Sequence, residues 1–214
     1  MGLIRIFSKW LPALLFRGSR EYWERRYALG GDSGAGSYGE AARYKAAVLN
    51  AFVEQHGIRS VMEFGCGDGH QLSLARYPAY VGLDVSDTAI ARCRAAFDSD
   101  PTKSFLPVGE YAGESAQLVL SLDVLFHLVE DAVYQEYLQQ VFGAASEYVI
   151  LYTTSTKEPL RTMRHVRHRP VEHDVATLFP QFQRMREVDE QLLPPPGEGA
   201  EVARFFFYRK TVSE

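Results

Sequence analysis

The chain has 214 residues, of which 46% are hydrophobic and 23% charged, and its formal net charge is -4. This length suits one globular domain with a single hydrophobic core. The acidic balance argues against a protein whose main task is to coat nucleic acid. Two cysteines, Cys66 and Cys93, are too few for a disulfide framework in a chain of this size, so the cytoplasm is the expected compartment.

The first segment, residues 2–16, is rich in Leu, Ile, Phe and Trp with cations between them. Its apolar runs are far shorter than the roughly 20 residues that cross a bilayer. Ser8, Lys9 and Pro12 interrupt these runs and no convincing cleavage site follows, which argues against a signal peptide. Two interpretations stay open: an amphipathic cover packed on the domain, or a helix that contacts the inner face of a membrane through Trp10 and its flanking cations.

The next part of the chain predicts helices separated by a glycine-rich loop. Residues 21–27 have helical character, and residues 30–39 contain five glycines among small and polar residues, which is typical of a loop. Residues 40–56 carry apolar side chains spaced by three or four, which predicts an amphipathic helix. We therefore divide the single domain into an N-terminal cover with a glycine-rich lid, residues 1–58, and a core, residues 59–214.

Short apolar runs then alternate with helical stretches, which predicts a parallel sheet covered on both faces. The tail differs, because two apolar runs flank a proline-rich turn at residues 194–199 and so predict an antiparallel end. The expected fold is α/β and Rossmann-like, a seven-stranded, mostly parallel sheet with helices on both faces and an antiparallel C-terminal strand. Strands are expected at 60–64, 79–85, 104–108, 116–122, 148–153, 182–192 and 203–210, and helices at 69–76, 88–97 and 131–142.

A glycine loop at residues 61–69 is the most informative stretch: an apolar strand runs directly into Gly65-Cys66-Gly67-Asp68-Gly69. Glycines let the backbone approach a ligand where a Cβ would clash. In an open α/β sheet such a turn lies at the carboxyl ends of the strands, where ligands bind. The spacing G-x-G-x-G differs from the G-x-G-x-x-G of dinucleotide sites, which disfavours a nicotinamide cofactor. The loop is therefore expected to contact a nucleotide-like cofactor.

A second apolar strand, Val81-Gly82-Leu83-Asp84, ends in an acid about 20 residues after the loop. Its carboxylate is well placed to accept hydrogen bonds from both ribose hydroxyls of an adenosine. The loop and the acid together point to an adenosine-containing cofactor more strongly than either motif does alone.

In these two motifs the sequence resembles the class I family of S-adenosylmethionine-dependent methyltransferases, over about residues 59–154. The resemblance implies methyltransferase activity, with S-adenosyl-L-methionine as cofactor and S-adenosyl-L-homocysteine as product. It also implies that Glu63 lies beneath the amino-acid part of the cofactor and that Asp84 binds the ribose. Val108-Gly109-Glu110 departs from the family, which often has a polar residue here for the adenine amine. The resemblance gives as cofactor-binding residues Glu63, Gly65, Cys66, Gly67, Gly69, Asp84, Val85, Leu122 and Asp123.

Tyr38 joins this set if the glycine-rich segment 30–39 folds over the cofactor as a lid. The other interpretation of this segment is a plain connector, because idle linkers carry glycines as well.

The candidate catalytic residue is His127, which follows the fourth expected strand and so lies at the mouth of the ligand crevice. A histidine near its ordinary pKa accepts a proton at neutral pH, as a sugar or other alcohol acceptor requires. The alternative is a histidine that caps the helix or shapes the pocket.

A cluster of arginines and histidines follows the fifth expected strand, where substrate loops of this fold commonly lie. Arg164, His165, Arg167 and His168 are the substrate-binding candidates, because arginine suits phosphate or carboxylate groups. A solvated basic face is the alternative. A metal site that includes His173 is disfavoured since the arginines repel a dication, and no metal is expected.

The stretch 21–27 and the glycine-rich segment after it also resemble the N-terminal region of small bacterial methyltransferases, some of which act on surface glycans or other small molecules. The likeness favours O-methylation of a sugar-like or other small acceptor. An acidic acceptor, such as a phosphorylated or carboxylated sugar, would explain the arginine cluster. No nucleic-acid partner is expected, and the rival functions are methylation of RNA or protein and a non-catalytic, cofactor-binding scaffold.

Overall fold

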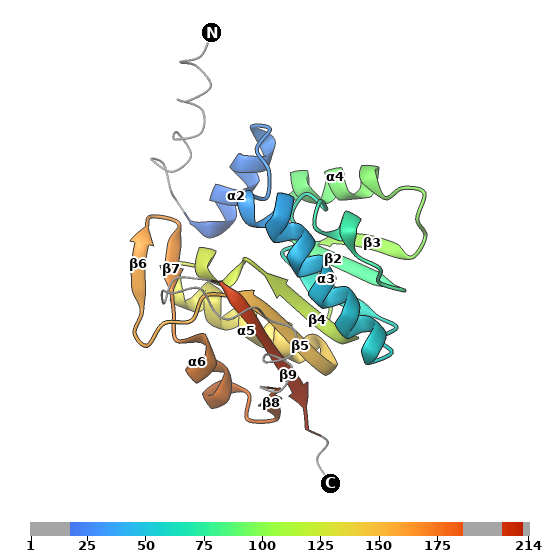
Figure 1. The fold of residues 1–214 in the computed structure, drawn as a ribbon. Coiled ribbons are helices and arrows are strands. Elements are labelled where there is room, and N and C mark those ends of the chain that lie inside the picture. Colours follow the sequence, from blue (N-terminus) through green and yellow to red (C-terminus); the bar gives the residue numbers. More distant parts are fainter. Residues whose placement is uncertain (1–17, 186–202, 212–214) are drawn as a thin grey trace.

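The computed structural model describes residues 18–185 and 203–211, which form a seven-stranded sheet in the order β3-β2-β1-β4-β5-β9-β8 (Figure 1). Strands β1 to β5 are parallel, and β9 is antiparallel to both of its neighbours. The predicted fold class is confirmed. The strands are β1 (Val61–Phe64), β2 (Tyr80–Asp84), β3 (Lys103–Pro107), β4 (Ala116–Leu122), β5 (Ala145–Thr153), β8 (Phe182–Arg184) and β9 (Arg204–Lys210).

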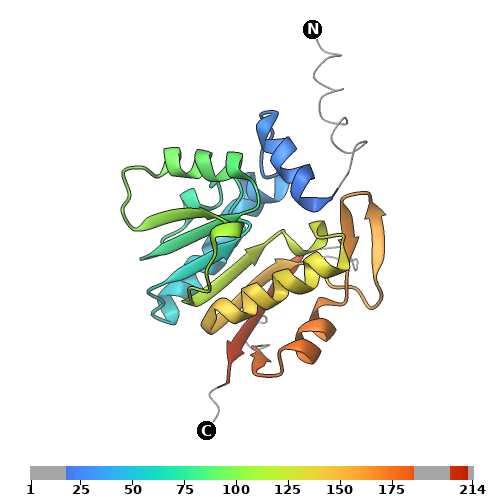
Figure 2. The same cartoon turned by 180° about the vertical axis from the view of Figure 1, so that it is seen from behind.

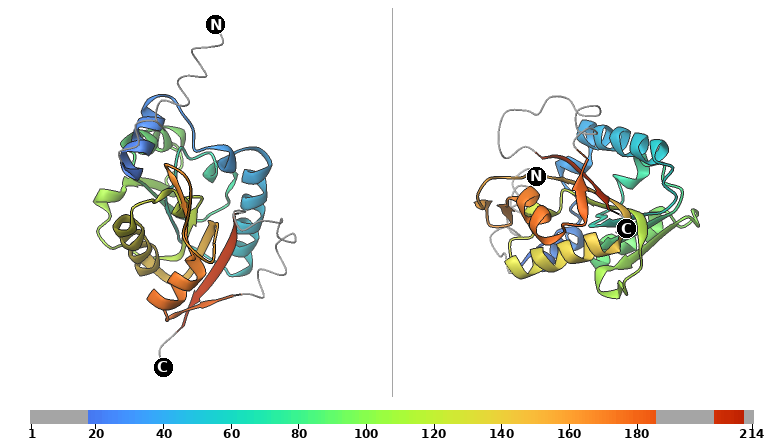
Figure 3. Two further views of the ribbon diagram at one scale, coloured as in Figure 1. Left: turned by 90° about the vertical axis from the view of Figure 1, so that its left-hand side faces the viewer. Right: turned by 90° about the horizontal axis from the view of Figure 1, so that it is seen from below.

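Helices cover both faces of the sheet, as Figure 3 shows from two sides. On one face α3 (Gly39–Gln55) and α4 (Asp87–Ala96) close a hydrophobic core, and on the other α5 (Asp131–Ala144) and α6 (Val171–Leu178) close a second. The alternation of side chains along a strand produces these two cores. In β9, Phe205 and Phe207 belong to the first core, and Phe206 and Tyr208 to the second.

The prediction of a helix at residues 69–76 is wrong, because the segment contains only the short 3-10 helix η2 (Leu72–Leu74). Gly69 has a φ of 79°, which is not helical. The Asn50 side chain of α3 donates to the carbonyl of Leu74 (3.0 Å) and accepts from the backbone N–H of Arg76 (2.7 Å). These contacts between elements replace the hydrogen bonds that another helical turn would make.

Two elements were not predicted, the helix α6 and a hairpin of β6 (Leu160–Met163) and β7 (Val166–His168). The hairpin pairs only with itself within the described chain and stands beside the start of α2 (Ser19–Ala28) (Figures 1 and 2). All four residues of β6 are exposed, so this strand lacks the alternating pattern of a sheet strand.

Some predictions lie outside the described residues: the N-terminal segment 2–16, the turn 194–199 and the end of the strand expected at 182–192. The boundary at residue 58 stays a prediction. Among the helices of residues 18–185, none has the length and apolar character needed to cross a bilayer.

Candidate functional site

A cavity of about 340 Å³ lies at the carboxyl ends of β1, β2 and β4, where an open α/β sheet binds its ligands. Its volume falls within the range of small-molecule sites. Its walls come from the glycine loop, the ends of β2 and β4, and the helices α2, α3 and α5. The sequence-predicted residues that line it are Glu63, Gly65, Cys66, Gly67, Asp84, Val85, Leu122, Asp123 and His127.

The glycine loop takes a backbone path that only glycine fits. Gly65 and Gly67 have φ angles of 82° and 59°. A Cβ on Gly65 would lie 2.4 Å from a methyl group of Val124, and a Cβ on Gly67 would lie 2.3 Å from Ser33 Oγ. The loop therefore presents bare backbone to the cavity, which is a suitable cradle for a cofactor.

Asp84 ends β2 and ties the glycine loop to the start of α4. Its Oδ2 accepts from the backbone N–H of Gly67 (3.0 Å) and its Oδ1 from that of Ser86 (2.9 Å). Burial raises the pKa of Asp84 to about 6. A carboxylate thus lies at the cavity wall, directly after the second strand.

Glu63 is buried beneath the cavity, where its Oε2 accepts a hydrogen bond of 2.6 Å from the Tyr80 hydroxyl. Burial raises the pKa of Glu63 to about 7, against the opposing effects of Tyr80 and the Lys45 charge. A carboxyl group in this position is partly protonated at neutral pH.

The contribution of Glu63 to the stability of the ligand-free protein is expected to fall as the pH rises from about 5 to 8. The folded-state pKa of Glu63, about 7, lies above its ordinary value of 4.5, so between these values the folded state binds more protons than the unfolded state. Asp84 acts in the same direction. Across this range the melting temperature of the unchanged protein should fall relative to that of Glu63→Gln, a comparison in which the opposing effect of His127, with its pKa lowered to about 4, cancels. An equal pH dependence in the two proteins contradicts the assignment to Glu63.

The glycine-rich segment 30–39 lies against the glycine loop. Ser33 and Asp68 exchange two hydrogen bonds, from the Ser33 N–H to Asp68 Oδ2 (2.9 Å) and from the Asp68 N–H to Ser33 Oγ (3.0 Å). The Tyr38 hydroxyl donates to the same Oδ2 (2.6 Å). Arg92 of α4 holds the carbonyl of Gly31 (2.7 Å). These contacts cover the loop, as a lid does.

Tyr38 and Gly69, both predicted to contact the cofactor, lie beside the cavity in a neighbouring depression. The Tyr38 ring stacks on His70, with ring centroids 4.1 Å apart. From the same part of the chain, Tyr27, Ser33 and Ser37 line the cavity instead. The predicted roles of Tyr38 and Gly69 stay predictions.

Lys45 of α3 lines the cavity and was not identified from the sequence. Only 1% of its side chain is exposed, and its Nζ lies 2.5 Å from Asp123 Oδ2. Its ammonium also lies 5.1 Å from the centre of the Tyr152 ring. A signal was present, because Lys45 falls on the buried stripe of α3 between Ala42 and Leu49.

His127 ends the 3-10 helix η4 (Leu125–His127) after β4 and faces the cavity. Its Nδ1 lies 3.1 Å from the carbonyl oxygen of His165. Because a carbonyl only accepts, Nδ1 carries the proton and Nε2 keeps its lone pair. Burial lowers the pKa of His127 to about 4, so the ring is neutral at ordinary pH.

The four predicted substrate-binding residues lie on the β6–β7 hairpin and do not line the cavity. Arg167 pairs with Asp131 (2.8 Å), and the buried His168 ring bonds to Thr154 Oγ1 (2.7 Å). His165 stacks on Tyr22, with ring centroids 4.6 Å apart. Arg164 is exposed near the hairpin turn. Their contact with substrate stays a prediction.

Comparison with known proteins gave a family match and several structural matches. Residues 62–145 match the family model of a methyltransferase domain. No curated protein matches the sequence. Among solved structures, the N-methyltransferase NodS from Bradyrhizobium japonicum WM9 with S-adenosyl-l-homocysteine has a TM-score of 0.64 at 14% identity, covering 90% of this chain and 98% of that one.

Two further structures have the same fold. Magnesium protoporphyrin IX methyltransferase from Synechocystis PCC 6803 with bound SAM has a TM-score of 0.63 at 13% identity, covering 92% of this chain and 99% of that one. A S-adenosylmethionine-dependent methyltransferase from Clostridium acetobutylicum ATCC 824 has a TM-score of 0.60 at 10% identity, with coverages of 80% and 92%. Residues 62–145 thus match a methyltransferase domain, and the described chain has the fold of these S-adenosylmethionine-dependent methyltransferases, with the glycine loop and Asp84 at its ligand edge.

Proposed function

We propose that this methyltransferase methylates a hydroxyl group of a small, sugar-like acceptor, and that His127 accepts the hydroxyl proton. The observation that carries the proposal is the orientation of the His127 ring. Its Nδ1 donates to the His165 carbonyl, and His127 lines the same cavity as the glycine loop and Asp84. A neutral imidazole with a free Nε2 is the base that an alcohol acceptor needs.

The residues around the cavity fit S-adenosylmethionine. Gly65 and Gly67 line the cavity with backbone alone, and Asp84 offers a carboxylate to the ribose hydroxyls. When bound, the cofactor supplies an electrophilic methyl group on a sulfonium. The chain then has to hold the acceptor in line with this group, exclude water and remove one proton.

His127 is a weak base because its pKa is low, but the timing of the reaction compensates for this. The acceptor hydroxyl becomes strongly acidic only as its oxygen forms the bond to carbon. Nε2 then takes the proton, while the electrons of the broken carbon–sulfur bond stay on sulfur. Neutral His127 is available for this step over the whole ordinary pH range.

One cation of the cavity lining supports an acidic acceptor. Arg20 of α2 lines the cavity, and its guanidinium suits a phosphate or carboxylate. We further propose that an acceptor extending toward the hairpin contacts the four candidate residues there, Arg164, His165, Arg167 and His168. The free thiols Cys66 and Cys93 support our proposal of a cytoplasmic, reducing location.

The first experiment is isothermal titration of the purified chain with S-adenosylmethionine, S-adenosylhomocysteine and, as control, a nicotinamide dinucleotide. Binding of the first two alone supports the proposal. An acceptor screen then compares phosphorylated and carboxylated sugars with neutral sugars and amines, and mass spectrometry identifies the methylated atom. Absence of binding, or methyl transfer only to nitrogen, overturns the proposal.

Asp84→Asn is expected to weaken S-adenosylmethionine binding about tenfold, because an amide replaces the charged acceptor of the ribose hydroxyls. The same titration measures this effect. Asp98→Asn is the matched control, since Asp98 is exposed at the end of α4. Unchanged affinity in Asp84→Asn would remove the ribose assignment.

A further inference from the structure

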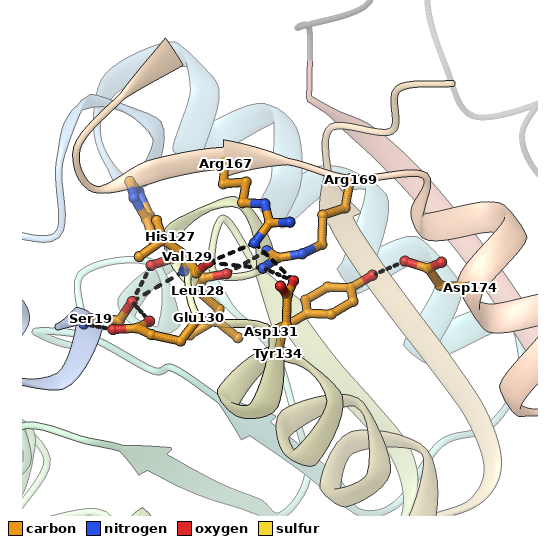
Figure 4. A network of polar contacts seen from close by, with 10 residues as sticks. All are labelled: Ser19, His127, Leu128, Val129, Glu130, Asp131, Tyr134, Arg167, Arg169 and Asp174. Carbon is orange, nitrogen blue, oxygen red and sulfur yellow. Dashed lines mark hydrogen bonds and ion pairs between the residues drawn. The ribbon is translucent and has the colours of Figure 1, made fainter. Parts of the chain in front are cut away.

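The turn that joins η4 to α5, residues 127–131, is held by side chains from distant segments (Figure 4). Ser19 Oγ lies 2.7 Å from both the carbonyl oxygen of His127 and Glu130 Oε2, and its one proton bonds to either of these acceptors. The Arg169 guanidinium donates to the carbonyls of Leu128 and Val129, the second at 3.1 Å. Backbone carbonyls that would otherwise be unpaired at the edge of the cavity are thus satisfied by side chains.

The Arg169 guanidinium contacts a carboxylate and an aromatic ring in addition to these two carbonyls. Its side chain is 5% exposed, and its Nη2 lies 3.0 Å from Asp131 Oδ1. Its guanidinium carbon lies 4.3 Å from the centre of the Tyr134 ring. The Tyr134 hydroxyl in turn donates to Asp174 Oδ2 (2.8 Å), so the ring beneath the guanidinium is held as well. These contacts fix the orientation of the buried Arg169 guanidinium.

Two neighbouring acids attach the turn to two different parts of the chain. Glu130 accepts from the N–H of Ser19 (2.9 Å), its Oε2 also lies 2.7 Å from the Ser19 hydroxyl, and Glu130 so fastens the start of α2. Asp131 pairs with Arg167 and Arg169 of the hairpin segment. The turn is therefore bonded both to the start of α2 and to the hairpin segment.

Residues 165–169, which include β7, supply both the partner of the His127 ring and the side chains that hold its turn. The His165 carbonyl accepts from His127 Nδ1, while Arg167 and Arg169 hold the residues that follow His127. The distance from the His127 ring to the His165 carbonyl therefore depends on how the arginines seat the turn against the hairpin.

We infer that Arg169 is a positioning residue for His127, which keeps the proton on Nδ1 and directs Nε2 to the cavity. This inference rests on the proposed function, in which His127 is the base. Arg169 itself does not line the cavity. Its effect passes through the carbonyls of Leu128 and Val129 and through Asp131. Lysine lacks the fork and cannot hold these acceptors together, so Arg169→Lys should release the turn.

The test is nitrogen NMR of the full chain labelled with 15N-histidine, with the His127 signal assigned by its loss in His127→Asn. In the unchanged protein His127 should be a single tautomer with the proton on Nδ1. Arg169→Lys should give mixed tautomers and move the pKa of His127 upward toward its ordinary value. With an acceptor in hand, Arg169→Lys should also lower kcat about tenfold while the Kd for S-adenosylmethionine changes less than about twofold.

Arg94→Lys is the matched control, since Arg94 of α4 also donates its guanidinium to a backbone carbonyl, that of Phe105 (3.0 and 2.7 Å). It should leave the His127 signal unchanged. If Arg169→Lys does not fold, Asp131→Ala loosens the same clamp from an exposed residue and should shift the tautomer in the same direction, to a smaller extent. A folded Arg169→Lys protein with the original tautomer and pKa overturns the inference.

The NMR result separates this inference from the proposed function, because it needs no acceptor. If His127→Ala transfers methyl groups at the original rate, the base assignment fails. The tautomer of His127 in Arg169→Lys still reports whether Arg169 seats the ring.

Discussion

Replacing His127 by alanine is expected to lower kcat for methyl transfer about 100-fold or more, with little change in the affinity for S-adenosylmethionine. His127 lines the cavity with its Nδ1 at the His165 carbonyl, and alanine in this position has no group that takes the acceptor proton. The measurement is the initial rate of S-adenosylhomocysteine formation with a hydroxyl acceptor from the screen, together with cofactor titration of the same preparation.

His173→Ala is the control for this variant, because His173 is exposed on α6. Its rate should equal that of the unchanged chain. The pH profile adds a second check: since the pKa of His127 is about 4, kcat should show no loss from this group above about pH 5. A His127→Ala protein that is folded and fully active contradicts the base assignment. One that loses its fold shows instead that the ring mainly shapes the pocket.

Replacing Lys45 by methionine is expected to lower the free energy of unfolding by about 3 kcal/mol. The change removes the partner of Asp123, whose side chain is only 17% exposed, and leaves a carboxylate without its countercharge. Burial already raises the pKa of Asp123, and the Lys45 ammonium opposes this effect. Urea unfolding followed by circular dichroism measures the loss.

The double variant Lys45→Met/Asp123→Asn should recover part of this stability, because it removes the isolated charge. Arg26→Met is the matched control on an exposed pair, with Asp32 at 2.8 Å and side-chain exposures of 30% and 61%. It should cost less than about 1 kcal/mol. If Lys45→Met costs no more than Arg26→Met, the buried pair does not stabilise the fold.

The parallel part of the sheet and its ligand loop were predictable from local sequence. An apolar strand that runs into Gly65 and Gly67, and a second that ends at Asp84, specify chain direction, turn and ligand edge within a short stretch. His127 was found for the same reason, because it follows β4 directly. The positions of these residues depend on neighbours in the chain and on the general arrangement of a parallel sheet.

Contacts between distant segments were not predictable in this way. Lys45 falls on the buried stripe of α3, but its partner Asp123 lies 78 residues later in the chain. The arginines of the hairpin suggested a surface for anions, whereas Arg167 and Arg169 bond to carbonyls and Asp131 at the start of α5. Their partners lie about 40 residues earlier, and only the folded chain brings them together. Hairpin strands of three and four residues were also too short to show a period.

The isolation of the β6–β7 hairpin has a consequence for how this enzyme could diverge. Within the described chain the hairpin shares no ladder with the seven-stranded sheet, yet its backbone and its arginines set the surroundings of His127. If His127 is the base, changes in this hairpin alter methyl transfer without shifting the register of any strand in the described sheet. Mutational drift and selection for new acceptors can act there while the cofactor-binding half of the molecule remains as it is.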